Sequence, residues 1–140
     1  MNNIKPYRDI SFSDCVDLIA AVGDKTTVLV QGETGTGKSS MRHALSAKMP
    51  KHKVFYCDLT TKDTGDIAMP KIRGADGEEV CEFVPNAELG LHSREPVILL
   101  WDELGKAQRG VLNACLRVLL EGKLGQYTLP PGSRQFATTN

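Results

Sequence analysis

The stretch Gly32-Glu33-Thr34-Gly35-Thr36-Gly37-Lys38-Ser39, called the glycine loop below, decides the fold of this chain. It matches the pattern G-x-x-x-x-G-K-[ST] at every fixed position, after an apolar run at 26–31 and before a helical pattern at 38–48. Glycines let the backbone N–H groups of such a loop converge on phosphate oxygens, and the following helix adds the positive end of its dipole. The stretch therefore predicts a strand, loop and helix that together bind phosphate groups.

The side chains of the glycine loop have separate expected roles. Lys38 is expected to reach the β- and γ-phosphates of a nucleotide, and the Ser39 hydroxyl to ligate Mg²⁺. The predicted nucleotide-binding residues are those of the loop and the serine after it: Gly32, Glu33, Thr34, Gly35, Thr36, Gly37, Lys38, Ser39 and Ser40. A nucleotide and Mg²⁺ are thus the expected cofactors.

A second apolar run ends in two adjacent carboxylates. Residues 97–101 are all apolar, and Asp102 and Glu103 follow directly. Ligands of open α/β sheets bind at the carboxyl ends of the parallel strands, so this edge is the expected site. We predict that Asp102 holds Mg²⁺ and that Glu103 orients and deprotonates the attacking water.

The segment 53–58 offers a competing interpretation. It is also an expected strand that ends in a carboxylate, Asp58, as the magnesium-binding strand of a small-molecule or nucleoside kinase would. The next residue is Leu59 rather than a second acid. We therefore prefer Asp102 as the metal ligand and expect Asp58 to have a structural role in an outer strand.

The remaining periodicities predict an α/β protein. Helical spacing covers 11–22 and 107–121, and extended patterns cover 134–139 and a hairpin at 70–84. The positions of the later helix that we expect to be buried are Val111, Leu112, Cys115, Leu116 and Leu119. Alternating strands and helices predict the three-layer αβα sandwich of a P-loop NTPase, with a mostly parallel sheet and a small β-hairpin insert.

Composition excludes several classes of protein. The chain has 140 residues, enough for one domain, and its 17 basic and 17 acidic side chains give no net charge, which does not support nucleic acid as a partner. No apolar run exceeds five residues and the start has no signal sequence, so we expect no membrane partner and a cytoplasmic location. The four cysteines are far apart and are expected to be reduced thiols.

The glycine loop, the Asp102-Glu103 pair and the strand that ends at Asn140 together resemble the core of an AAA+ ATPase. The resemblance covers about residues 18–140. It implies ATP as the nucleotide, and it implies that Lys38, Glu103 and Asn140 are the catalytic residues, with Asn140 as the sensor of the γ-phosphate.

Within that class the sequence is most similar to MoxR-like and dynein- or midasin-related modules. Those modules carry a hairpin inserted in the second helix, which residues 66–83 followed by 85–89 resemble. Further similar segments are 102–107, the Leu-Pro-Pro of 129–131, and 137–140. Trp101 departs from the family, which usually has a smaller aliphatic residue there.

The resemblance also implies a function for the whole assembly. Such modules form homo-oligomeric rings and couple ATP hydrolysis to remodelling of a partner protein. They continue past the sensor residue into an arginine finger and a helical lid, so we expect 1–140 to be a core truncated after Asn140 and only weakly active alone. The alternative is a nucleotide-dependent interaction module with little turnover, whose acidic segment 74–103 and hairpin bind a partner.

Overall fold

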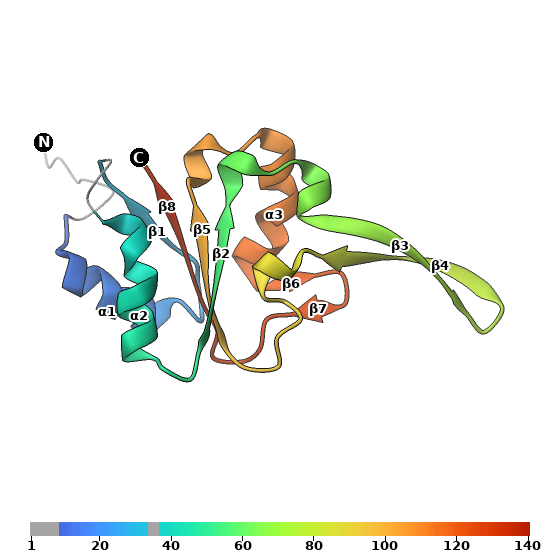
Figure 1. Ribbon diagram of the computed structural model, residues 1–140, viewed down its shortest axis with the longest axis horizontal. Coiled ribbons are helices and arrows are strands. Elements are labelled where there is room, and N and C mark those ends of the chain that lie inside the picture. Colours follow the sequence, from blue (N-terminus) through green and yellow to red (C-terminus); the bar gives the residue numbers. More distant parts are fainter. Residues whose placement is uncertain (1–8, 34–36) are drawn as a thin grey trace, which may run out of the picture.

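The computed structural model describes residues 9–33 and 37–140, and within them a central four-stranded sheet lies between helices on both faces (Figure 1). The strands are β1 (Val28–Gln31), β2 (Lys53–Asp58), β5 (Val97–Asp102) and β8 (Arg134–Thr139). Their order is β1-β8-β5-β2, and every pairing is parallel. This confirms the predicted α/β fold of a P-loop NTPase.

The helices divide the core into two layers. The helices α1 (Phe12–Val22) and α2 (Met41–Lys48) cover one face of the sheet, and α3 (Arg109–Glu121) covers the other. Strand β5 lies between them, and all of its residues are buried. Its side chains alternate, so that Ile98 and Leu100 pack against α1 and α2 while Leu99 and Trp101 pack on the α3 side. A strand buried on both faces needs a continuous apolar run, which 97–101 supplies.

The parallel register brings the predicted site residues to one edge of the sheet. Asp102 pairs with Asp58 across β5 and β2, and Trp101 pairs with Ala137 across β5 and β8. The carboxyl ends of these strands therefore meet, together with the segment that follows β1.

An antiparallel hairpin projects from the body of the domain (Figure 1). It consists of β3 (Ala68–Ala75) and β4 (Glu78–Pro85), so the hairpin predicted at 70–84 is present and its strands extend slightly beyond those bounds. A smaller hairpin, β6 (Lys123–Leu124) and β7 (Tyr127–Thr128), follows α3.

The buried face of α3 differs in part from the predicted one. The buried stripe of α3 is Val111, Cys115 and Val118, whereas Leu116 is 50% exposed. Cys115 and Val118 follow Val111 by four and seven residues and therefore share one side of the helix with it. Leu116 comes directly after Cys115 and points away from that side. The prediction that Leu116 is buried was therefore wrong.

The described residues contain no disulfide, and Cys15, Cys57 and Cys115 are buried free thiols while Cys81 is exposed on β4. In the same part of the chain, no helix is long and apolar enough to cross a membrane.

Trp101 is accommodated by a buried polar partner on the neighbouring strand. Its indole N–H donates to Oε1 of Gln135 at 2.9 Å, and the Gln135 amide donates in turn to the Val118 carbonyl at 2.9 Å. The pair thus connects β5, β8 and α3, and it gives the departure at Trp101 a structural reason.

We predict that Gln135→Leu lowers the free energy of unfolding by ~1–3 kcal/mol, because it leaves the buried indole N–H without an acceptor. Urea denaturation measures the change. Gln126→Leu is the matched control, since Gln126 is exposed between β6 and β7 and should change stability little. Equal stability of the two variants would contradict this role of Gln135.

Candidate active site

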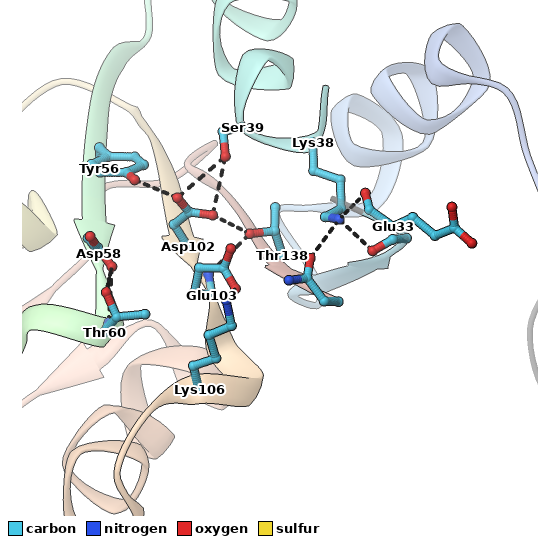
Figure 2. A network of polar contacts seen from close by, with 12 residues as sticks. Glu33, Lys38, Ser39, Tyr56, Asp58, Thr60, Asp102, Glu103, Lys106 and Thr138 are labelled. Carbon is cyan, nitrogen blue, oxygen red and sulfur yellow. Dashed lines mark hydrogen bonds and ion pairs between the residues drawn. The ribbon is translucent and has the colours of Figure 1, made fainter. Parts of the chain in front are cut away.

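The candidate site lies at the carboxyl edge of the sheet, where α2 begins above β5 and β8 (Figure 2). Of the predicted loop residues, Thr34, Gly35 and Thr36 lie outside the described residues. Gly37 has a φ of 82°, a left-handed conformation that favours glycine, and the chain continues as the 3₁₀ turn Lys38–Ser40 into α2. The Ser40 hydroxyl donates to the Gly37 carbonyl at 2.6 Å, within its own turn.

Lys38 is buried and surrounded by acceptors. Its ammonium donates to the carbonyls of Gly32 at 2.5 Å and Glu33 at 2.9 Å, and to Oδ1 of Asn140 at 3.0 Å. The predicted phosphate-binding lysine and the predicted sensor residue are therefore in direct contact, although they are distant in sequence.

Asp102 is buried and accepts hydrogen bonds from hydroxyl groups of different elements (Figure 2). Thr138 of β8 donates to Oδ1 and Tyr56 of β2 donates to Oδ2, each at 2.5 Å. Ser39 contacts the two oxygens at 3.3 and 3.4 Å. The predicted metal ligands Ser39 and Asp102 thus lie side by side.

These contacts keep the carboxylate ionised. Burial raises the pKa of Asp102, but the hydroxyl donors Thr138, Tyr56 and Ser39 and the backbone N–H of Glu103 outweigh it, so the pKa is below its ordinary value. Burial, followed by the hydrogen bond to Asp102, raises the pKa of Tyr56, which keeps the phenol protonated as a donor. The site therefore presents a fixed negative charge beside Ser39.

Glu103 adopts a backbone conformation that is rare for a residue with a side chain. Its φ is 59° and its ψ is 46°, in the left-handed region, and its N–H donates to the Thr138 hydroxyl at 3.2 Å. The buried Oε2 accepts no hydrogen bond from the described residues, and the Lys106 ammonium makes an ion pair with it at 3.4 Å. Oε2 is therefore able to accept a hydrogen bond from a water molecule.

The Asp58 carboxylate makes hydrogen bonds within its own segment of the chain. Its Oδ1 accepts hydrogen bonds from the backbone N–H and the hydroxyl of Thr60, at 3.0 and 2.7 Å, and so caps the short 3₁₀ turn that follows β2. This capping role favours Asp102 over Asp58 as the metal ligand.

Sequence reasoning missed Tyr56 and Thr138. Both residues carry a hydroxyl group and lie in largely apolar strands. Because side chains alternate between the two faces of a strand, the sequence could have placed Thr138 on the same face as Phe136, which packs toward α2. The pairing of β2 and β8 with β5, which brings both hydroxyls to Asp102, could not be read from the chain.

The donor set fits Mg²⁺ carried on a nucleotide rather than a metal held by protein alone. Within the described residues no group of three or more His, Cys, Asp or Glu side chains could hold a metal ion. Mg²⁺ bound with a nucleotide typically takes one or two carboxylates and completes its shell with phosphate oxygens and water. Ser39 and Asp102 would supply the protein ligands of such an ion.

A family profile described as AAA domain (dynein-related subfamily) matches residues 27–132. The match spans more than half of the chain and includes the glycine loop, Asp102 and Glu103. The chain belongs to this family of AAA domains. Membership implies nucleotide binding, normally with Mg²⁺, and ATPase-type chemistry.

Solved structures share the fold of this AAA domain. A proposed ATPase from Cytophaga hutchinsonii ATCC 33406 aligns with a TM-score of 0.58 and 16% identity over 91% of this chain and 38% of its own. NtrX from Brucella abortus aligns with a TM-score of 0.55 and 19% identity over 94% of this chain and 31% of its own. The AAA domain thus spans well under half of either protein. Among curated protein sequences, none matches significantly.

We predict that Thr138→Val lowers the free energy of unfolding of the AAA domain by ~1–3 kcal/mol. The substitution preserves shape but removes the hydroxyl that donates to Asp102 and accepts from the Glu103 N–H. Thr139→Val is the control on the adjacent, partly exposed position. A Thr138→Val variant as stable as the control, in urea denaturation, would show that the bridge is not needed to hold the buried carboxylate.

Proposed function

We propose that this AAA domain binds Mg·ATP at the carboxyl edge of the sheet and hydrolyses it. The observation that carries the proposal is the contact of the Ser39 hydroxyl with the ionised Asp102 carboxylate at 3.3 Å. Ser39 directly follows Lys38 in the sequence. A hydroxyl and a carboxylate beside a lysine at a helix start are the groups that hold a metal-bound triphosphate. When bound, Mg²⁺ would neutralise charge on the phosphate oxygens.

The chain's own residues then have separate roles. Lys38 would exchange its present acceptors for β- and γ-phosphate oxygens, and Glu103 would accept a proton from the water that attacks the γ-phosphorus. The bond from the γ-phosphorus to the bridging oxygen breaks, giving ADP and inorganic phosphate. Asn140, already in contact with Lys38, would orient the water and the γ-phosphate.

We further propose the finer assignment to a MoxR-like motor that forms a homo-oligomeric ring and remodels a partner protein. Its support is the sequence resemblance around the hairpin and residues 102–107. In such rings a neighbour's arginine completes the site, a contribution worth ~10³–10⁵ in rate. Separate domains should therefore bind ATP far better than they hydrolyse it, and the turnover number should rise with protein concentration.

A second candidate function is a nucleotide-dependent interaction module. The projecting hairpin favours it, because large apolar side chains are exposed on it: Ile72 is 71% exposed, Met69 60% and Phe83 54%. In this case occupancy of the site, rather than turnover, would control binding of a partner to β3 and β4.

One experiment separates these possibilities: ATP binding and phosphate release, measured together at saturating Mg²⁺ over a wide range of protein concentration. We predict that Glu103→Gln binds ATP as the native chain does but releases phosphate at least ~100-fold more slowly, because the general base is lost. Glu121→Gln on the surface of α3 is the matched control. Native turnover in Glu103→Gln would remove Glu103 from the role of base.

The remaining outcomes decide between the functions. Asp102→Asn should weaken Mg²⁺-dependent ATP binding and Asp58→Asn should not; the reverse would support the kinase interpretation. ATP binding by the native chain with no phosphate release at any concentration would favour the interaction module. Rapid turnover independent of concentration would contradict a ring whose neighbours complete the site.

A further inference from the structure

Tyr56 makes a contact that neither the glycine loop nor the Asp102-Glu103 pair accounts for. It lies in β2, on the sheet face covered by α2, and its phenol donates to Oδ2 of Asp102 at 2.5 Å (Figure 2). The side chain is partly buried, and its phenol donates its single proton to this carboxylate.

The guanidinium of Arg42 lies over the ring of Tyr56. The guanidinium carbon lies 4.4 Å from the ring centroid, within the range of a cation–π contact. Arg42 belongs to α2, the helix that continues from the Lys38–Ser40 turn. The arrangement thus links the helix after the glycine loop, through a strand side chain, to the carboxylate of β5.

The two shortest hydrogen bonds to Asp102 are made to different oxygens of its carboxylate. Thr138 binds Oδ1 from β8 and Tyr56 binds Oδ2 from β2, the strands on either side of β5. A carboxylate held at both oxygens cannot rotate freely about its terminal bond, and Ser39 lies near both oxygens at 3.3 and 3.4 Å. Hydrogen-bond partners of metal ligands orient those ligands, and their loss typically weakens metal affinity ~10–100-fold.

We propose that Tyr56 is a positioning residue that fixes the orientation of the Asp102 carboxylate toward the metal of a bound nucleotide, and that Arg42 holds the Tyr56 ring for this task. The inference rests on the proposed function, because it assigns Tyr56 and Arg42 to the same magnesium-dependent site. It differs from a structural role in one respect. A purely structural role changes stability alone, whereas a positioning role also changes the dependence of nucleotide binding on Mg²⁺.

The test is Tyr56→Phe, which removes the hydroxyl and keeps the ring under Arg42. Binding of a fluorescent ATP analogue is measured while Mg²⁺ is titrated, and again in excess EDTA. We expect the Mg²⁺ concentration at half-maximal binding to rise ~10-fold, with affinity in EDTA unchanged. Tyr127→Phe is the matched control, because it removes a phenol from β7, which lies away from the carboxyl end of β5 in Figure 1.

A double-mutant cycle tests the part played by Arg42. Arg42→Ala should raise the Mg²⁺ requirement in the same direction and by less, and it should add nothing when Tyr56 is already phenylalanine, because both act through one hydroxyl. Arg42→Lys keeps the charge without the planar group and should lie between native and Arg42→Ala. An Mg²⁺ effect of Arg42→Ala that persists in full without the phenol would overturn the link between the two residues.

The outcomes also separate this inference from the proposed function. If the native chain binds the analogue with Mg²⁺ but Tyr56→Phe has the native Mg²⁺ requirement or a lower one, the positioning role is wrong and the proposed function stands. An equal loss of binding with and without Mg²⁺ would likewise overturn it. If the native chain binds no analogue under any condition, the proposed function fails and this inference fails with it.

Discussion

Burying an ionised carboxylate costs free energy unless polar partners surround it, and the partners of Asp102 come from elements far apart in sequence. Ser39 comes from the turn before α2, Tyr56 from β2 and Thr138 from β8. These partners reach the carboxylate because β2 and β8 flank β5 and α2 covers the same face. The strand order β1-β8-β5-β2 thus assembles the site as well as the core.

The same edge brings together the ammonium that a triphosphate would contact and the carboxylate that would accept a proton from the attacking water. Lys38 has the carbonyls of Gly32 and Glu33 and the amide of Asn140 as acceptors, so phosphate oxygens would replace partners that the chain already supplies. Glu103 has a left-handed backbone, and its carboxylate lies near Lys106. The Thr138 hydroxyl accepts a hydrogen bond from the Glu103 N–H and donates one to the Asp102 carboxylate. One threonine thereby couples the proposed base to the proposed metal ligand.

Local patterns predicted much of this arrangement. The glycine loop, the apolar run into Asp102 and the strand into Asn140 each follow from spacing along the chain, and parallel strands place their ends at one edge. Tyr56 and Thr138 could not be predicted as partners of Asp102, because their roles depend on which strands lie beside β5. The exposure of Leu116 was missed for a different reason: Cys115 and Leu116 are both apolar, but only Cys115 shares a side of the helix with Val111 and Val118.

The central claim is that a metal-bound nucleotide occupies the carboxyl edge of the sheet, and its most direct test is paramagnetic line broadening by Mn·ATP in the amide NMR spectrum. Mn²⁺ should broaden the signals of residues 37–40, 102–103 and 138–140. It should spare residues 23–27 and 129–133, which line a cavity of about 180 Å³ that also includes the C-terminal end of α3. Broadening confined to that cavity, or none at saturating Mn·ATP, would contradict the account.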